Sequence, residues 1–168
     1  MSSHTWVLAS LHSLFYNDRR GLPTATDALH PNLIVCPINC RDRIESLLQS
    51  ATHSIYMYQQ YIADDRIQHI LQQQKEKGRD IKLILWDKKD GGDTRDKPFL
   101  DAFTWHIKMQ SDPYVHAKVI LVDNEFLLIG SMNMSDTSMN KNREIGILLL
   151  NRYQIEKMMN MFMKDWSR

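Results

Sequence analysis

Residues 114–133, YVHAKVILVDNEFLLIGSMN, decide the fold of this chain. Two apolar runs flank the segment DNEF at residues 123–126, a pattern typical of a β-hairpin between two strands. We expect Asn124 and Glu125 to be the two residues of the hairpin loop. That loop length sets the register of the two strands, and the register decides which side chains face one another.

Four polar side chains interrupt this otherwise apolar hairpin: His116, Lys118, Ser131 and Asn133. His116 and Lys118 point the same way, because alternate residues of a strand share a face. With a two-residue loop, Lys118 lies opposite Ser131 and His116 lies opposite Asn133, with Cβ atoms about 5 Å apart. Burying such a cluster is costly unless a polar group lies among it, and a phosphate fits this requirement. A three-residue loop would break the cluster.

The rest of the chain alternates predicted strands and helices. Apolar runs predict four further strands, at residues 32–36, 54–62, 81–86 and 144–150. Helical patterns begin near residue 40, where Asn39 can act as the cap, and at Asp64 or Asp65, with Gly78 placed to end the second helix. The C-terminal helix has one apolar face, made of Ile155, Met158, Met159, Phe162 and Trp166.

Strand, helix and strand at this spacing form a βαβ unit, which implies a parallel pair of strands covered by helices. The sequence therefore predicts an α/β fold with a mixed, largely parallel central sheet and helices on both faces.

Composition narrows the function classes only slightly. The chain has 168 residues, of which 43% are hydrophobic and 24% are charged, as in an ordinary globular domain. Its net charge of +1 lacks the basic excess typical of nucleic-acid binders, which is weak evidence against a nuclease. No apolar run reaches membrane-spanning length, and a signal-peptide pattern is missing. The compartment stays open, with a cytoplasmic or membrane-peripheral location as the default expectation.

Neither the cysteines nor the most polar loop predicts a metal site or a cofactor. Cys36 and Cys40 enclose Pro37, are too few for a disulfide scaffold and lack the second ligand pair of a zinc site, so we interpret them as packing residues. Residues 87–97, DKKDGGDTRDK, form a polar loop. It lacks the twelfth-position glutamate of a calcium-binding loop, so we interpret it as solvated.

The hairpin resembles the HKD motif of the phospholipase D superfamily. The pattern H-x-K-x4-D, six further residues and G-S-x-N is formed by His116, Lys118, Asp123, Gly130, Ser131 and Asn133. The likeness continues at Ser138, Asn142 and Glu144, and the βαβ region resembles the first elements of the family's fold. It covers residues 32–166, so we expect an HKD domain at residues 32–168.

The resemblance implies a two-step mechanism at paired HKD motifs, usually without a metal. One histidine attacks phosphorus and forms a phosphohistidine, and the other protonates the leaving oxygen and then activates water or an alcohol. By position, His116 is the nucleophile or the acid, while Lys118, Ser131 and Asn133 hold the phosphate. Glu144 corresponds to the acidic residue that braces a catalytic imidazole.

Asp123 completes the catalytic set of the motif by resemblance. Its odd position in the strand makes it face away from His116, so we expect its role within that set to be structural.

This chain contains a single HKD motif, so a second half must come from elsewhere. A homodimer could supply it, or a second repeat upstream in a longer parent chain. Residues 14–20 resemble residues 161–166, with Phe and Asp three apart in both, as at the end of a family repeat. We therefore expect residues 1–31 to contain the helical tail of a preceding repeat and a linker from residue 21. On this interpretation the chain resembles the C-terminal half of a two-motif, cardiolipin synthase-like protein.

The motif's surroundings favour a phospholipid substrate. The form G-S-x-N-x-S-x-x-S, the N-R-E that follows and the opening H-P-N-L-I-V-x-P resemble lipid-acting members. Met134 stands where the small single-motif nucleases favour an aromatic residue. The leading hypothesis is a phospholipid hydrolase or phosphatidyltransferase that contacts the membrane surface transiently. The alternatives are a homodimeric, metal-independent endonuclease and a half-domain that is inactive without its partner repeat.

Overall fold

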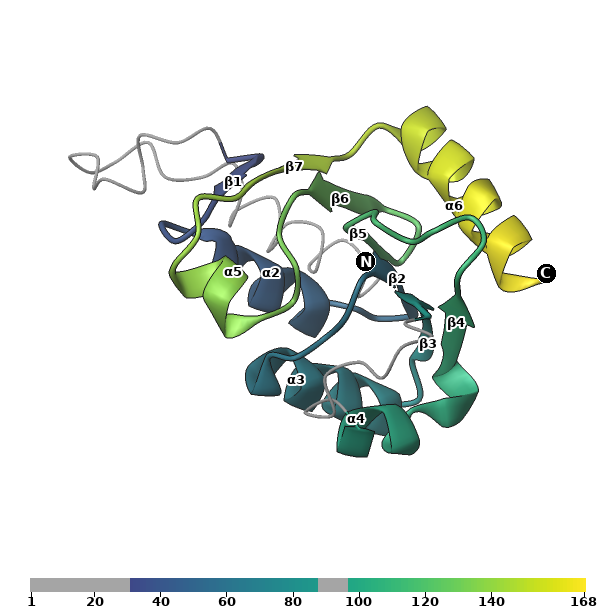
Figure 1. The fold of residues 1–168 in the computed structure, drawn as a ribbon. Helices are drawn as coiled ribbons and strands as arrows, with labels where there is room; N and C mark the ends of the chain where they lie inside the picture. Colours follow the sequence, from purple (N-terminus) through teal and green to yellow (C-terminus); the bar gives the residue numbers. More distant parts are fainter. Residues whose placement is uncertain (1–30, 88–96) are drawn as a thin grey trace.

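A seven-stranded mixed sheet runs through the residues that the computed structural model describes, 31–87 and 97–168 (Figure 1). The strands are β1 (Leu33–Val35), β2 (Ser54–Gln59), β3 (Asp80–Trp86), β4 (Ile107–Gln110), β5 (Val119–Val122), β6 (Phe126–Gly130) and β7 (Ile145–Leu149). Their order across the sheet is β1-β7-β6-β5-β2-β3-β4. The helices are α2 (Cys40–Gln49), α3 (Asp65–Glu76), α4 (Lys97–Ala102), α5 (Asp136–Asn140) and α6 (Arg152–Trp166), with a 3-10 turn η2 (Thr104–His106).

The α/β class, the mixed sheet and the helices on both faces are confirmed, but the sheet is not largely parallel. β2 pairs with β3, and β3 with β4, in parallel. The other four pairings are antiparallel. The βαβ pattern correctly predicted the first parallel pair. Of the antiparallel pairs, β5–β6 is joined by a short hairpin loop and β6–β7 by a segment that contains α5, whereas β2–β5 and β1–β7 join strands far apart in the sequence.

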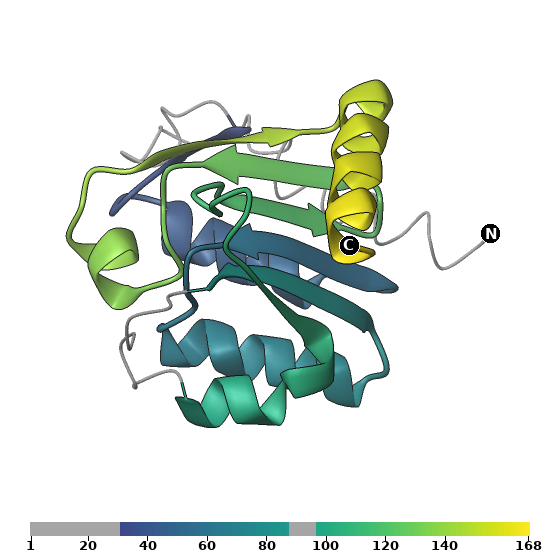
Figure 2. The ribbon, with the colours of Figure 1, turned by 45° about the vertical axis from the view of Figure 1, so that its right-hand side comes forward.

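The two faces of the sheet carry different helices (Figure 2). α2, α3 and α4 lie against one face, whose core includes Ile44, Leu71 and Phe103. α6 covers part of the other face, where Ile155 and Phe162 are buried and the rest of the predicted apolar stripe is partly buried. The predicted stripe is thus confirmed as a core contact.

The C-terminal F-x-x-D pattern anchors α6 to the sheet. The ring of Phe162 stacks on that of Tyr56 and meets Tyr58 edge to face. The hydroxyl of Tyr58 donates a hydrogen bond to the carboxylate of Asp165 at 2.8 Å. Both fixed positions of the pattern therefore contact β2.

The β5–β6 hairpin has a three-residue loop, so the predicted two-residue loop is wrong. Val122 pairs with Phe126, and the loop consists of Asp123, Asn124 and Glu125. Asp123 and Asn124 both lie in the left-handed region, with φ of 55°, which these two residue types tolerate better than most. The Asp123 carboxylate accepts hydrogen bonds from the backbone of residues 52–54 and from the Thr52 hydroxyl. These bonds hold Asp123 in the loop, outside the paired strands.

The predicted caps of α3 are confirmed, whereas the predicted cap of α2 is confirmed only in position. Asp64 is the N-cap of α3, and its carboxylate accepts from the backbone of Arg66 and Ile67. Gly78, at φ +75°, follows the C-cap. Asn39 occupies the N-cap position of α2, but its side chain turns back and accepts from the backbone N–H of Val35.

Some predictions lie outside the described residues. The N-terminal helix and linker at residues 1–30 and the central part of the polar loop, residues 88–96, are among them. Within the described ranges, no helix is both long and apolar enough to cross a membrane.

Candidate active site

The motif side chains gather at one end of the sheet. His116 and Lys118 precede β5, Ser131 and Asn133 follow β6, and Glu144 precedes β7. Because β6 runs antiparallel to both neighbours, the end of β6 and the beginnings of β5 and β7 lie at the same edge. The structure therefore places these five residues at one end of the sheet, although the three-residue loop was expected to separate the first four.

The predicted pairing across the hairpin is wrong in detail. With the three-residue loop, Lys118 pairs with Gly130, whose N–H donates to the Lys118 carbonyl oxygen at 3.1 Å. Ser131 is paired instead with the first residue of β7, since its N–H donates to the carbonyl oxygen of Ile145 at 3.0 Å. Strand register alone therefore does not place Lys118 opposite Ser131.

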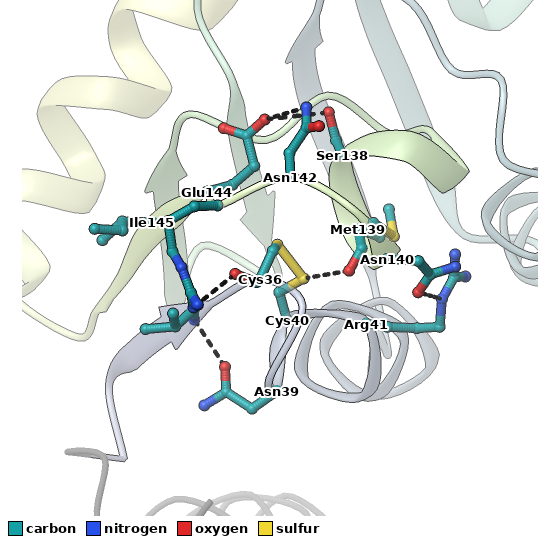
Figure 3. The surroundings of a disulfide bond; sticks show 12 residues. Cys36, Asn39, Cys40, Arg41, Ser138, Met139, Asn140, Asn142, Glu144 and Ile145 are labelled. Atoms are coloured by element: carbon teal, nitrogen blue, oxygen red, sulfur yellow. Dashed lines mark hydrogen bonds between the residues drawn. A yellow bond between two sulfur atoms is a disulfide. The ribbon is translucent and has the colours of Figure 1, made fainter.

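Glu144 accepts hydrogen bonds from several side chains of the site. Its carboxylate accepts hydrogen bonds from Ser131 Oγ at 2.5 Å, Asn142 Nδ2 at 3.2 Å and Ser138 Oγ at 3.4 Å. The last two contacts are drawn in Figure 3. The negative charge of Glu144 also favours the protonated form of Lys118 and so opposes the lowering of the Lys118 pKa by burial. Glu144, directly before β7, thus links the beginning of β5 and the end of β6 at the open end of the hairpin.

Lys118 is buried, with 7% of its surface exposed. Its Nζ donates to Gln60 Oε1 at 2.7 Å and to the carbonyl oxygen of His116 at 2.9 Å. Burial lowers the pKa of Lys118 on balance, and the charge of Glu144 opposes this shift. Sequence reasoning missed Gln60. The only signal for it was a polar residue directly after the apolar strand β2, at the end of the sheet that carries the site.

His116 is exposed and stacks loosely on Tyr114, with ring centroids 5.9 Å apart and planes 27° apart. Tyr114 in turn meets Trp86 edge to face at 5.3 Å. Within the described part of the chain, no group makes a hydrogen bond to the imidazole. The predicted brace from Glu144 therefore does not form inside this half, and it stays a prediction for a paired site.

Backbone hydrogen bonds hold the segment after β6 on both sides of Asn133. A Cβ at Gly130 would come within 2.5 Å of Met132 Sδ and 3.0 Å of the Ile145 carbonyl oxygen, so the glycine permits the close approach of these groups. Ala63 and Asp64 both donate backbone hydrogen bonds to the Met134 carbonyl oxygen. The Oδ1 atom of Asn133 is buried and has no hydrogen-bond partner within the described residues. An unsatisfied buried acceptor is costly, and it marks a position where a ligand donor would be stabilising.

Asp123 lies at the opposite end of the hairpin from these residues. Its carboxylate accepts from the backbone N–H groups of Thr52, His53 and Ser54 and from the Thr52 hydroxyl, all at 2.7–2.8 Å. Burial opposes its ionisation, but these hydrogen bonds outweigh burial and lower its pKa. The geometry agrees with the structural role expected for it.

A disulfide lies behind the site, so interpreting the two cysteines as unpaired packing residues is wrong. Cys36 and Cys40 are fully buried and joined, with Cα atoms 5.0 Å apart (Figure 3). Ile38 and Asn39 both donate to the Val35 carbonyl oxygen, and this tight turn brings the sulfur atoms together. Two cysteines cannot brace a whole domain, but they can close one turn. The Cys36 N–H donates to the Glu144 carbonyl oxygen at 2.9 Å, so the turn also supports the site.

Within residues 31–87 and 97–168, no group of three or more His, Cys, Asp or Glu side chains is placed to bind a metal ion.

Comparison with known proteins assigns the family. A family model described as "Cardiolipin synthase, PLD-like domain" matches residues 44–166. The chain belongs to the phospholipase D superfamily. This PLD-like domain is also 27% identical, over 184 residues, to cardiolipin synthase A of Pseudomonas putida. The match covers 96% of this chain but only 38% of that relative.

Solved structures confirm the fold of this PLD-like domain. A phospholipase D family member, Nuc from Salmonella typhimurium, has a TM-score of 0.72 and 24% identity, covering 80% of this chain and 92% of that one. NucT from Helicobacter pylori has a TM-score of 0.66 and 19% identity, covering 79% and 92%.

Proposed function

We propose that this PLD-like domain is a phosphodiesterase that works through a phosphohistidine on His116. The observation that carries the proposal is a buried ammonium, Lys118, that contacts the backbone of His116, whose exposed imidazole accepts and donates no hydrogen bond within the described residues. The ammonium offsets the negative charge of a phosphodiester, and the imidazole is free to attack phosphorus. The amide of Asn133 adds a hydrogen-bond donor for the phosphate oxygens, and the Ser131 hydroxyl would add another once it turns from Glu144, to which it donates in this structure.

The reaction needs a second imidazole. In the first step an imidazole nitrogen of His116 forms a bond to phosphorus. The bond from phosphorus to the leaving oxygen breaks, and the second imidazole donates its proton to that oxygen. In the second step this imidazole takes a proton from water or an alcohol, whose oxygen attacks phosphorus and displaces His116. One imidazole cannot be deprotonated nucleophile and protonated acid at the same moment, so the second group must come from another HKD half.

An uncovered apolar surface supports pairing with such a half. Ile147 pairs with both Leu33 and Ile129, so these three side chains share the face of the sheet that α6 covers elsewhere. Ile145 and Ile147 are nevertheless 56% and 46% exposed. Ile145 follows Glu144 directly, so a half that covers this row would also approach the site.

Light scattering on the full chain tests the pairing. We expect a dimer, and we expect Ile147→Asp to shift it toward the monomer and to lower turnover together with dimer content. Tyr153→Asp, at a large and more exposed side chain on α6, is the control. A strict monomer with full turnover would contradict the pairing, whereas a strict monomer without turnover would support a half-domain that needs an upstream repeat.

We propose a phospholipid as the substrate, which makes the protein a hydrolase or a phosphatidyltransferase at a membrane surface. The printed names of the family model and of the Pseudomonas putida relative support this choice. A homodimeric endonuclease is the second candidate, because the Nuc chain of similar length has this fold and is covered to 92%.

Substrate assays separate the two candidates. The protein is incubated with vesicles of phosphatidylglycerol, phosphatidylcholine or cardiolipin, and separately with single- and double-stranded DNA. We expect release or transfer of a lipid headgroup by the natural protein and by His69→Ala, an exposed histidine on α3, but not by His116→Ala. DNA cleavage without lipid turnover would overturn the lipid assignment, and equal turnover by His116→Ala would remove the proposed nucleophile.

A further inference from the structure

A chain of hydrogen bonds joins the site lysine to an aromatic ring beside the imidazole. Lys118 Nζ donates to Gln60 Oε1 at 2.7 Å, and Gln60 Nε2 donates to Tyr114 Oη at 2.8 Å. The Tyr114 ring stacks on His116, whose carbonyl oxygen accepts a second bond from Lys118 at 2.9 Å. Gln60 is thus the one side chain in this set that contacts both Lys118 and Tyr114.

The ammonium sets the direction of each bond in this chain. A lysine ammonium can only donate, so the side of the Gln60 amide that faces Lys118 must be the oxygen. The amide nitrogen then faces Tyr114, whose phenolic oxygen accepts. The phenolic hydrogen of Tyr114 is left to donate elsewhere, and Tyr114 is 51% exposed beside His116. Its hydroxyl is therefore a donor available at the mouth of the site.

The neutral amide also preserves the charge of Lys118. Two of its three N–H groups are occupied by uncharged acceptors, Gln60 Oε1 and the His116 carbonyl oxygen, which leaves the third for a phosphate oxygen. A carboxylate in place of the amide would form an ion pair with the ammonium and compete with an anionic substrate.

We propose that Gln60 is a positioning residue, which orients the Lys118 ammonium toward the substrate phosphate and sets the Tyr114 hydroxyl as a further hydrogen-bond donor there. This inference rests on the proposed function, because both groups act on a phosphodiester bound next to His116. Gln60 itself contacts no reacting atom.

Three variants and one control test the proposal. Gln60→Met removes both hydrogen bonds at similar side-chain length, and Gln60→Glu keeps an acceptor for Lys118 while adding a charge. Tyr114→Phe keeps the ring and removes only the hydroxyl. Gln72→Met is the matched control, because Gln72 is a half-buried glutamine on α3 that bonds to Glu76 away from the site.

We expect Gln60→Met to lower kcat/KM on the order of tenfold and Tyr114→Phe about threefold, with Gln72→Met unchanged. Gln60→Glu should raise KM for an anionic phospholipid on the order of tenfold. It should also move the basic limb of the pH–rate profile to higher pH, because a carboxylate raises the pKa of Lys118. The other titratable groups around Lys118, namely His116, Tyr114 and Glu144, are unchanged in this variant. A merely structural role would lower the unfolding midpoint and leave that limb in place.

NMR titration of the Lys118 side chain gives a readout that needs no turnover. Its titration should move to higher pH in Gln60→Glu and stay in place in Gln72→Met. If Gln60→Met keeps kcat/KM within about twofold and Gln60→Glu leaves the Lys118 titration unmoved, the positioning role is overturned while the proposed function stands. A natural protein without turnover of any phosphodiester would overturn the function and this role together, whatever the titration shows.

Discussion

The two ends of the β5–β6 hairpin treat their polar groups in opposite ways. At the turn, the carboxylate of Asp123 accepts four hydrogen bonds from residues 52–54. At the other end, the imidazole of His116 has no hydrogen-bond partner within the described residues, and Asn133 Oδ1 is buried without one. Lys118 is buried there with a lowered pKa. The turn uses its carboxylate to hold the fold, whereas the other end leaves an exposed imidazole without a hydrogen-bond partner within the described residues.

This difference separates two kinds of motif position. Asp123 and His116 belong to the same H-x-K-x4-D pattern, yet only His116 lies at the site. Residues of one motif therefore need not share one role. Variants at the two ends should accordingly affect different measurements.

The largest expected effect is at the open end. His116→Ala should lower kcat/KM by at least about 10³-fold, because the proposed covalent intermediate cannot form. The free energy of unfolding should change by less than about 0.5 kcal/mol, since the side chain is exposed and makes no hydrogen bond within the described residues. Steady-state kinetics and urea unfolding measure the two quantities. A loss of stability as large as that of an Asp123 variant would erase the contrast between the two ends.

The second largest effect is expected at the turn, where a substitution should lower the free energy of unfolding. Asp123→Ala leaves three backbone N–H groups and one hydroxyl without their acceptor, so we expect the free energy of unfolding to fall by about 3 kcal/mol. Turnover per folded molecule should fall far less than in His116→Ala. Glu125→Ala, at the exposed third residue of the same loop, is the control and should be nearly neutral. If Asp123→Ala unfolds like the natural protein but loses all turnover, Asp123 is catalytic after all.

A smaller effect is expected from the disulfide behind the open end. Replacing Cys36 and Cys40 together by alanine should lower the free energy of unfolding by about 2 kcal/mol, since the closed loop is short. Addition of a thiol reductant to the natural protein should approach the same value, and it should leave the double variant unchanged. An equal response of both proteins to reductant would show that the bond does not contribute.

The smallest effect concerns acidic pH. Hydrogen bonds outweigh burial and lower the pKa of Asp123, and Arg41 with two backbone N–H groups does the same for Asp64. A carboxylate with a lowered pKa in the folded state contributes stability above its unfolded pKa, about 4, and loses it as the pH falls through the folded value. Urea midpoints measured from pH 7 down to pH 3 should therefore decrease. Asp123→Asn should flatten that dependence, and an unchanged slope would contradict the turn's role.

Much of this molecule follows from short-range sequence pattern. The apolar runs and the helical stripe predicted α6 and every strand except β4, because periodicity depends on residues only a few positions apart. The sequence also predicted that His116, Lys118, Ser131 and Asn133 cluster on one face of the hairpin. These residues do lie at one end of the sheet, but the register from which the cluster was predicted is wrong.

Tertiary structure decided what depends on distant partners. The loop has three residues because Asp123 finds its donors about seventy positions earlier in the chain, at Thr52, and no local rule includes them. Gln60 reaches Lys118 across 58 positions, so the residue that completes the lysine's hydrogen bonds was not visible in the motif. Local pattern determined which elements form and which residues carry the chemistry. Long-range hydrogen bonds and strand order determined how those residues face one another, because such contacts exist only once the sheet has assembled.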